Sequence, residues 1–402
     1  MDLISRLADA DQWKEFYEYK QASGHLTQKD LQKLADFIEN KEYLECVTAI
    51  SKGGTFAPPR RACISKMHSD KKRIVYIYPE TESNILKLLT FLLQRTYDDI
   101  FTKHLYSFRP QTGVRHAIRR LTHTAGIRNM WSYKVDISNY FNSIPVEKML
   151  FILRQTLADE PRIYAFIETL LLNPLVSDNA VLIEEEKGIM AGTPISTFLA
   201  NVYLNHMDHY FADAGILYAR YSDDIIFFAP SEHALQENIL YLKQTLADSG
   251  LTVNPKKEQI TKPGEPWTFL GFVFENGTVD IAPVSVEKLK AKMRRKTKAL
   301  MRWKNKKGLS GVHAAKAFVR IFNQKLFENP IDHELTWTRW YFPFINTTKS
   351  LKIIDVYSQS CIRYLATGTR TKSAYNFRYE DMKALGYISL VNAYYNHRKN
   401  FD

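Results

Sequence analysis

Three acidic residues stand where strand-like segments end, and they are the residues of this chain best suited to chemistry. Asp223 and Asp224 follow Tyr221 between two runs of apolar residues. β-Branched and aromatic residues on both sides of a short polar pair predict strand, tight turn and strand. Asp136 ends another strand-like run. Three carboxylates presented from strand ends suit a pair of Mg²⁺ ions about 3.5–4 Å apart, the arrangement that catalyses in-line phosphoryl transfer.

The same acidic residues also have a purely structural interpretation. Asp tolerates tight turns and accepts hydrogen bonds from its own backbone, so an Asp-Asp pair in a hairpin needs no catalytic role. Asp136 or Ser138 could simply cap the start of a helix. The catalytic interpretation therefore depends on further motifs that occur in a workable order.

The basic charge of the chain is concentrated in one segment. The 402 residues are 45% hydrophobic and carry a net charge of +12, which favours a polyanionic partner. Residues 286–307 hold eleven Lys or Arg and one acid, Glu287, a local excess of +10. Leu289, Met293, Leu300 and Trp303 are spaced as the apolar stripe of a basic helix. Such a helix can follow a nucleic-acid backbone, although a solvated helix face is the alternative.

Cysteine usage and hydropathy indicate where the protein works. Cys46, Cys63 and Cys361 show neither zinc-ligand nor disulfide spacing, which favours a reducing compartment. No apolar run approaches the roughly 18 residues of a membrane span, and the N-terminus has no signal-peptide core. We therefore expect a soluble, cytoplasmic protein.

The order of strand-like and helical segments predicts an α+β fold. We expect an N-terminal helical extension over residues 1–58, a mixed core over residues 59–282 and a helical, basic region over residues 283–402. Within the core, residues 146–172 read as one long helical stretch and residues 267–274 as one strand.

Six motifs in chain order resemble blocks of the bacterial non-LTR reverse transcriptases, the group that includes group II intron, retron and phage-defence enzymes. They are Phe108-Arg109-Pro110, residues 136–141, residues 192–201, residues 221–224, Lys257 and Phe269-Leu270-Gly271. The resemblance implies a right-hand polymerase. Its fingers and palm, an antiparallel sheet plus helices, would span residues 59–282, and an all-helical thumb would span residues 283–402.

The resemblance also implies roles for individual residues. Asp136, Asp223 and Asp224 would be catalytic and, with the Ile137 carbonyl, would bind two Mg²⁺ ions, with Mn²⁺ as an alternative. The implied dNTP-binding residues are Lys66, Arg73, Arg109, Phe141, Gly192 and Lys257. The implied nucleic-acid-binding residues are Tyr221, Phe269, Gly271, Lys292, Arg294, Arg295, Lys298 and Arg302.

Some of these roles have alternatives in the sequence. Phe141 stands where the family has an aromatic residue that excludes a ribose 2′-hydroxyl, which implies dNTP substrates, but it could also be a core aromatic. Lys66 and Arg73 could belong to a solvated basic loop. Ala191 and Thr197 differ from the residues that many relatives have beside Gly192 and Ser196. The resemblance is therefore to stand-alone reverse transcriptases of the unknown group. Many of these enzymes are associated with antiphage defence.

We therefore expect an RNA-directed DNA polymerase that takes dNTPs, copies an associated non-coding RNA and makes DNA in antiphage defence. One alternative is template-independent or protein-primed DNA synthesis, since 23 tyrosines could act as primers. An alternative of another class is a catalytically silent RNA-binding scaffold. The sequence leaves open whether the chain forms a homo-oligomer.

Overall fold

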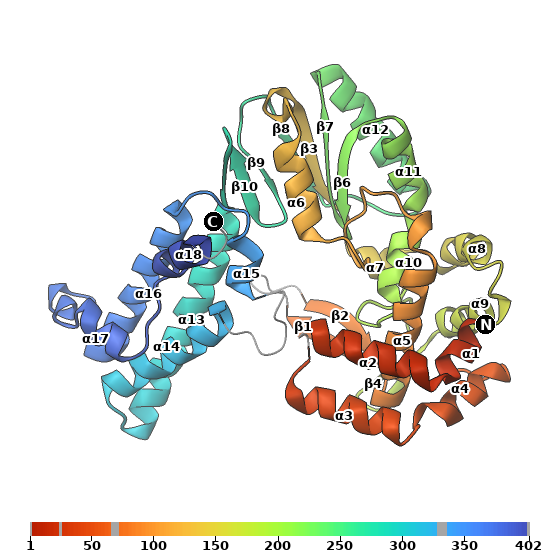
Figure 1. The fold of residues 1–402 in the computed structure, drawn as a ribbon, viewed down its shortest axis with the longest axis horizontal. Helices are drawn as coiled ribbons and strands as arrows, with labels where there is room; N and C mark the ends of the chain where they lie inside the picture. The colour runs from red at the N-terminus through yellow and green to blue at the C-terminus, as the bar shows by residue number, and fades with distance from the viewer. Residues whose placement is uncertain (1, 24–25, 66–71, 328–335, 400–402) are drawn as a thin grey trace. The chain divides into compact units, whose positions relative to one another are not determined.

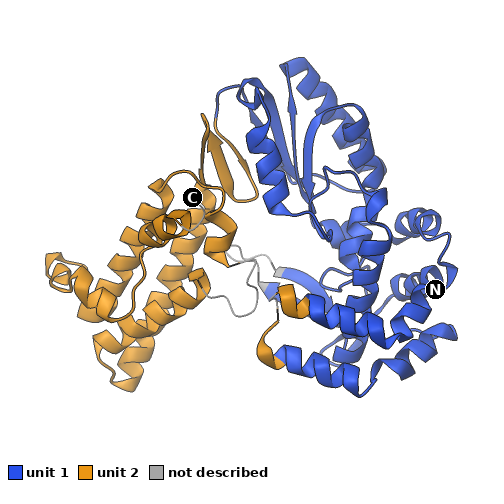
Figure 2. Cartoon of the chain, viewed as in Figure 1, with its two compact units in different colours: residues 1–19, 30–265 blue, residues 20–29, 266–402 orange. Residues whose placement is uncertain are grey.

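The computed structural model describes residues 2–23, 26–65, 72–327 and 336–399 (Figure 1). The chain divides into two compact units (Figure 2). The first unit holds Met1–Tyr19 and Asp30–Glu265, and the second holds Lys20–Lys29 and Pro266–Asp402.

The first unit is built around a four-stranded antiparallel sheet with the strand order β6-β7-β3-β8. Its strands are β3 (Trp131–Asp136), β6 (Leu217–Tyr221), β7 (Asp224–Ala229) and β8 (Gln259–Thr261). Five of the six residues of β7 are buried, because α11 (Asn205–Asp213) packs on β6 and α12 (Glu232–Asp248) packs on β3 and β7. A strand covered in this way takes a continuous apolar sequence.

A second four-stranded sheet in this unit has the order β2-β1-β4-β5. Its strands are β1 (Arg60–Ser65), β2 (Lys72–Ile77), β4 (Leu175–Asp178) and β5 (Val181–Glu184). β1 pairs antiparallel with β2 and parallel with β4. Asn179 and Ala180, the two residues between β4 and β5, both have positive φ, as a two-residue type I′ hairpin requires.

Helix α5 is largely buried among other helices of the first unit. Nine of its residues are buried, which is typical of a helix that is apolar on all sides, and α1 and α4 pack on it. The helices are α1 (Leu3–Ala8), α2 (Ala10–Ser23), α3 (Gln28–Glu39), α4 (Tyr43–Ser51), α5 (Glu80–Thr96), α6 (Val114–His123), α7 (Tyr140–Ser143), α8 (Val146–Thr156), α9 (Pro161–Leu172) and α10 (Ser196–Tyr203), with short 3₁₀ turns η1 (Asp98–Ile100), η2 (Ile127–Asn129) and η3 (Pro255–Lys257). The long helix predicted over residues 146–172 is two helices, because Pro161 begins a new one.

The second unit contains a small sheet and a helical bundle. Its antiparallel sheet β11-β10-β9 consists of β9 (Trp267–Phe269), β10 (Phe272–Glu275) and β11 (Thr278–Ile281). Its helices are α13 (Pro283–Lys307), α14 (Gly311–Phe327), α15 (Trp337–Tyr341), α16 (Lys349–Thr367), α17 (Tyr379–Ala384) and α18 (Leu390–Lys399), with the 3₁₀ turn η4 (Lys372–Asn376). The three long helices α13, α14 and α16 pack against one another.

The apolar stripe predicted on α13 is largely as expected. Leu289, Met293 and Leu300 are buried in the bundle. Trp303 lies outside the stripe, since 37% of its surface is exposed. The stripe thus holds the helix in the bundle and leaves most of its cations toward solvent.

The α+β fold class is confirmed, and the sheet β9–β11 belongs with the helical unit. The N–H of Ala282 donates to the Gly271 carbonyl at 2.8 Å, and the Ser350 hydroxyl donates to Asp280 at 2.8 Å. The compact units therefore divide between Glu265 and Pro266, ahead of the predicted boundary after residue 282, and the second unit is not purely helical. Among the described helices, none is long and apolar enough to cross a membrane.

Candidate active site

A two-residue turn between β6 and β7 places Asp223 at the tip of a hairpin. Tyr221 pairs with Asp224, which leaves Ser222 and Asp223 as the turn residues. Ser222 has a φ of +60°, as the first central residue of a type II′ turn does. That position normally belongs to glycine, so the surrounding structure must hold Ser222 in place.

The sheet brings Asp136 to the same edge. Asp136 on β3 lies directly opposite Asp224 on β7, and Cβ atoms of such pairs are about 4.5–5.5 Å apart. The N–H of Ile137 donates to the Asp223 carbonyl at 3.0 Å, which ties the turn to the end of β3. The three aspartates predicted from the sequence therefore form one cluster.

Two lysines neutralise part of this cluster. The Lys257 ammonium lies 2.5 Å from an Asp136 carboxylate oxygen, and the Lys134 ammonium lies 3.7 Å from one of Asp224. Lys134 was not predicted as a site residue. Its signal in the sequence is the spacing of two from Asp136, which places both side chains on one face of β3.

Burial makes the aspartates costly to ionise. Burial, opposed by Lys134 and assisted by Asp223 and Asp136, raises the pKa of Asp224 to about 6. Burial and the neighbouring Asp136 charge also raise the pKa of Asp223. One carboxylate oxygen of Asp224, Oδ1, is buried without a hydrogen bond. Buried carboxylates of this kind favour the binding of a cation.

The donor set fits a hard divalent cation. Carboxylate oxygens are preferred ligands of Mg²⁺, and the Asp224 Oδ1 atom has no hydrogen-bond partner. The ammonium groups beside Asp136 and Asp224 would compete with such an ion. Among the described residues, however, no three His, Cys, Asp or Glu side chains close around a single point as a metal cage. The cluster is therefore suited to ions that keep water or phosphate oxygens as further ligands. Such an ion would compete with the Lys257 ammonium for Asp136.

An aromatic and cationic wall belongs to the same site. The Arg73 guanidinium lies 5.7 Å from the centre of the Phe141 ring, and its charge opposes the rise in the Asp223 pKa. Phe141 is half-buried and packs edge-on to Phe108, with 6.5 Å between the ring centres. The ring centres of Phe108 and Tyr221 are 6.4 Å apart. The structure thus brings the predicted residues Arg73, Phe141 and Tyr221 together with the aspartates. Lys66 lies outside the described residues.

Gly192 holds a loop close to strand β2. It has a φ of +98°, and a Cβ at this position would lie 2.9 Å from the Val75 Cβ. The N–H of Tyr76 donates to the Ala191 carbonyl, and Asn142 bridges both segments through Ile74 and Ala191. Only glycine fits this close backbone approach, so Gly192 positions the loop beside Phe141's helix.

Arg109 has a structural position. Its five N–H groups donate to the Asp98 carboxylate and to the carbonyls of Asp98, Thr102 and Leu105. A guanidinium has five donors, so this network would have to open before Arg109 could bind a triphosphate. The predicted dNTP-binding role came from the family resemblance and from the charge of Arg109, and it remains a prediction. The geometry favours a role in holding the loop that precedes Arg109.

Phe269 and Gly271 also face the protein itself. Phe269 is fully buried, so its side chain has no surface for nucleic acid. A Cβ on Gly271 would lie 2.8 Å from the Tyr341 hydroxyl. The glycine therefore allows close approach to a helix of its own unit, and its predicted role in nucleic-acid binding remains a prediction.

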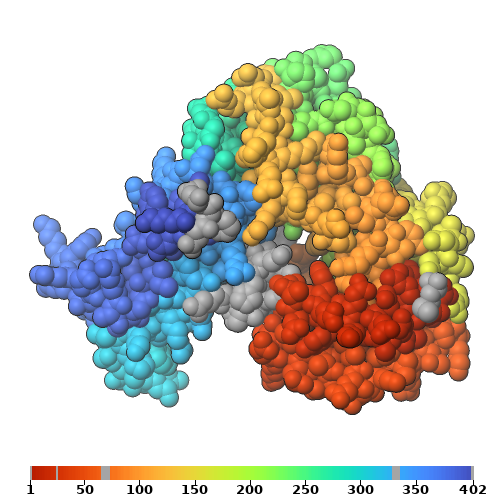
Figure 3. Space-filling view, in the orientation of Figure 1, coloured from red at the N-terminus to blue at the C-terminus, as the bar shows by residue number. Residues whose placement is uncertain are grey.

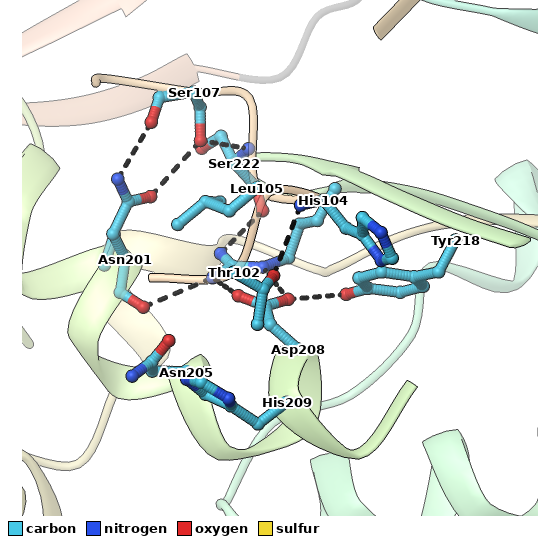
Figure 4. A network of polar contacts seen from close by, with 12 residues as sticks. Thr102, His104, Leu105, Ser107, Asn201, Asn205, Asp208, His209, Tyr218 and Ser222 are labelled. Carbon is cyan, nitrogen blue, oxygen red and sulfur yellow. Dashed lines mark hydrogen bonds and ion pairs between the residues drawn. The ribbon is translucent and has the colours of Figure 1, made fainter. Parts of the chain in front are cut away.

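A buried polar network supports the turn (Figure 4). The Ser107 hydroxyl accepts the N–H of Ser222 at 2.8 Å and donates to Asn201 at 3.2 Å, while the Asn201 amide donates back to the Ser107 carbonyl. Arg220 is wholly buried against Asp208 and donates to the carbonyls of Asn201 and Ser222. The backbone that carries Asp223 is thus fixed by hydrogen bonds from three segments of the chain.

The cations of α13 divide between a groove and an open face. Lys292, Arg295 and Lys296 line a groove of about 380 Å³ between α13 and α14, together with Lys325 and the apolar Ala299, Ile321 and Phe322. Burial and the neighbouring cations lower the pKa of Lys292. Arg294, Lys298 and Arg302 are exposed elsewhere on the helix. The groove has the charge expected of a phosphate-binding surface.

Comparisons with known proteins match this chain to one family. The family described as reverse transcriptase (RNA-dependent DNA polymerase) matches residues 64–274. The group II intron-encoded protein LtrA of Lactococcus lactis subsp. cremoris is 24% identical over 218 residues, which are 53% of this chain and 35% of the relative. The retron Ec86 reverse transcriptase of Escherichia coli is 24% identical over 164 residues, 40% of this chain and 47% of the relative.

Other relatives show the same partial coverage. Protein YkfC of Escherichia coli (strain K12) is 26% identical over 157 residues, which are 38% of this chain and 40% of that protein. The chain thus spans less than half the length of the curated relatives it matches. Among solved structures, telomerase from Candida Tropicalis in complex with a fragment of telomeric RNA has a TM-score of 0.48 at 11% identity, covering 83% of this chain and 68% of that chain.

Proposed function

Because this chain belongs to the reverse transcriptase (RNA-dependent DNA polymerase) family, we propose that it extends a 3′-hydroxyl with dNTPs on an RNA template. The observation that carries the proposal is the cluster of Asp136, Asp223 and Asp224 at one edge of the sheet. Arg73 and Phe141 beside that edge supply a cation and an aromatic ring for a nucleotide.

Each residue has a task in this proposal. Asp136, Asp223, Asp224 and the Ile137 carbonyl would hold two Mg²⁺ ions, or Mn²⁺ in their place. The chemistry that such ions would supply there is a lower pKa of the primer hydroxyl and neutralisation of the leaving pyrophosphate.

The residues around the aspartates bind and select the nucleotide. Arg73 pairs with the triphosphate, and the Phe141 ring packs against the sugar, where it excludes a 2′-hydroxyl. Lys257 neutralises Asp136 before substrate binds and then turns its ammonium to the triphosphate. Gly192 positions the loop behind the nucleotide, and the basic face of α13 follows the duplex that forms.

We further propose that the template is an associated non-coding RNA and that the activity serves antiphage defence in the cytoplasm. Similarity to a retron reverse transcriptase and to group II intron-encoded proteins supports an RNA partner. The three cysteines are free thiols, which supports a reducing compartment. Phage challenge of cells that carry the wild-type gene or Asp223→Ala tests the defence role, which requires protection to depend on Asp223.

The experiment for the biochemical proposal purifies the protein with any nucleic acid that accompanies it. Mg²⁺ and labelled dNTPs are added, and both the bound RNA and the product are sequenced. Product complementary to one discrete RNA, and absent with Asp223→Ala, supports RNA-directed synthesis. Product without a matching template would instead support template-independent or protein-primed synthesis. Bound RNA without any product from the wild type would support the scaffold alternative.

A further inference from the structure

The C-terminal end of α16 and the turn η4 that follows it form a basic and aromatic surface. Residues 356–379 contain Arg363, Arg370, Lys372 and Arg378 and no Asp or Glu. This stretch of chain, blue in the space-filling view, lies at the surface of the second unit (Figure 3). None of these four cations belongs to the active site described above.

Cations cover the aromatic rings of this surface in pairs. The Arg370 guanidinium lies 4.5 Å from the centre of the Tyr364 ring, and the Arg363 guanidinium lies 4.7 Å from that of Tyr375. Tyr375 keeps 67% of its surface exposed. An exposed cation–π pair contributes little to stability, so folding alone gives little reason to gather several such pairs.

A third pair extends the surface along the helix. The Lys290 ammonium on α13 lies 5.3 Å from the centre of the Tyr357 ring, and the charges of Arg294 and Arg370 also act on the pKa of Tyr357. Tyr357 and Tyr364 are seven residues apart, so they share one face of α16 with a rise of roughly 10 Å between them. We call Tyr357, Tyr364, Tyr375, Arg363 and Arg370 the cation–aromatic surface.

Hydroxyl-bearing residues lie between Tyr364 and Tyr375 in the sequence. Thr367, Thr369, Thr371 and Ser373 are connected to one another by hydrogen bonds along the segment that joins α16 to η4. Hydroxyls both donate and accept, so they can bind phosphate oxygens or sugar hydroxyls. The surface therefore offers stacking platforms, cations and neutral hydrogen-bonding groups within one short segment.

We propose that the cation–aromatic surface binds unpaired RNA. Aromatic rings with interleaved cations are the means by which proteins bind single strands, because unpaired bases expose faces for stacking and phosphates attract the cations. A duplex offers its phosphates but not its base faces. The choice of RNA rests on the proposed function, in which the RNA template is the long unpaired strand available to this protein. The groove between α13 and α14 is lined by other cations of α13 than Lys290, which contacts Tyr357.

Fluorescence anisotropy with labelled oligo(U) RNA of about 20 nucleotides tests the proposal directly. The double variant Tyr364→Ala/Tyr375→Ala should bind at least about tenfold more weakly than wild type, because stacking contributes about 1–3 kcal/mol per base. Arg370→Gln should weaken binding less and reduce its salt dependence. Tyr395→Ala, at a 53% exposed tyrosine on α18, and Lys352→Gln, at an exposed lysine of α16, are the matched controls and should bind as wild type does.

Further arms of the experiment separate the proposal from its alternatives. Asp223→Ala should retain oligo(U) binding, because Asp223 is not part of the cation–aromatic surface. A wild type that makes no DNA would refute the proposed function, and the oligo(U) result would still stand. The double variant should keep its affinity for duplex RNA and its circular dichroism melting curve. Unchanged oligo(U) binding by the folded double variant would overturn the proposal. So would an equal loss of duplex binding, or binding of anionic phosphatidylserine vesicles in preference to RNA.

Discussion

Among single residues, two of the three clustered aspartates, Asp223 and Asp224, are costly to ionise. Burial raises the pKa of Asp224 to about 6, yet nothing in the described structure hydrogen-bonds its Oδ1 atom. Lys134 and Lys257 supply only part of the missing positive charge. A cluster with no ligand to bind would gain stability by losing one of its carboxylates, so the presence of all three favours a site that binds a cation.

Phe141 is expected to select the sugar. Phe141→Ala should lower the preference for dNTPs over rNTPs by at least about tenfold, because it removes the ring that would meet a 2′-hydroxyl. The ratio of kcat/KM for dTTP and UTP measures this preference. Phe151→Ala, at a phenylalanine with 69% of its surface exposed on α8, serves as the control. An unchanged ratio would remove Phe141 from the selection of sugar and leave it as a packing residue.

Ser107 is expected to act as a positioning residue for Asp223. Ser107→Ala leaves the N–H of Ser222 without its acceptor, which should cost about 1–3 kcal/mol of stability. A turn displaced by a fraction of an ångström should also lower kcat by about tenfold or more, with little change in KM for dNTP. Steady-state primer extension and urea unfolding measure the two effects.

The control for Ser107 is another buried hydroxyl. Thr90 on α5 donates to the Leu86 carbonyl away from the site, and Thr90→Val should lose stability without losing kcat. Equal losses of kcat in both variants would mean that Ser107 affects activity only through folding.

Residue positions could be predicted from the sequence where local structure determines them, and not where distant segments meet. Asp136, Asp223 and Asp224 could be placed together because strand ends and a tight turn fix their positions. The role of Arg109 could not, because its donors go to Asp98 and to loop carbonyls that no pattern of residue types reveals. The Ser107–Asn201 contact joins segments 94 residues apart and leaves no local signal.

At the scale of elements, turns decided which predictions succeeded. Residues 267–274 read as one strand but form the hairpin β9–β10, because Leu270 and Gly271 adopt positive φ. Leucine rarely does so, so a leucine at this position is a weak signal of a turn. The β4–β5 hairpin was likewise missed, since Asn179-Ala180 is a weaker turn signal than Asn-Gly. The β6–β7 hairpin was predicted because two strongly apolar runs enclose a polar pair.

The loop at Gly192 provides a test at this scale. Gly192→Ala adds a methyl group 2.9 Å from the Val75 Cβ and retains a φ of +98°, so it should cost about 2–4 kcal/mol through strain and overpacking together. Activity should fall as well, because the loop lies beside the helix that carries Phe141. Chemical unfolding and primer extension measure the two losses.

Gly126 is the matched control for Gly192. It has a φ of +75°, and a Cβ there would meet nothing within 4 Å. Gly126→Ala should therefore show the strain of positive φ alone, about 1–2 kcal/mol, and keep its activity. If both variants lost the same stability and the same activity, the close approach between the loop and β2 would not matter for activity.

At the scale of the whole molecule, a buried histidine makes stability depend on pH. His104 is buried, neither ring nitrogen has a hydrogen-bond partner, and burial together with Arg120 and Lys103 lowers its pKa to about 4. In the unfolded chain its pKa is about 6.5. The unfolded state therefore binds more protons between these values, and the His104 contribution to stability is complete above pH 6.5 and is lost as the pH falls toward 4.

Replacement of His104 tests this linkage. Between pH 7 and pH 5 the wild type should lose about 1–2 kcal/mol more than His104→Leu does, as measured by urea unfolding at both pH values. Parallel losses in the two proteins would show that other groups set the acid sensitivity.

The domain organisation shows what the sequence could and could not reveal at this scale. The basic helix was predictable because eleven cations gather over residues 286–307. The division at Glu265 was not, because the sheet β9–β11 is tied to the helices by contacts such as Ser350 with Asp280. Strand-like residues alone do not reveal with which helices a sheet packs.

Asp224→Asn tests whether the three aspartates hold divalent cations for polymerisation. Thermal unfolding is measured with and without Mg²⁺, alongside extension of a DNA primer on an RNA template. The variant should melt a few degrees above wild type without Mg²⁺, at about 2–4 °C per kcal/mol, because it removes a costly buried carboxylate. Mg²⁺ should raise the melting temperature of wild type alone, and only wild type should extend the primer. A variant that extends the primer normally, or a wild type whose stability and activity do not change with Mg²⁺, would show that these aspartates do not hold catalytic cations.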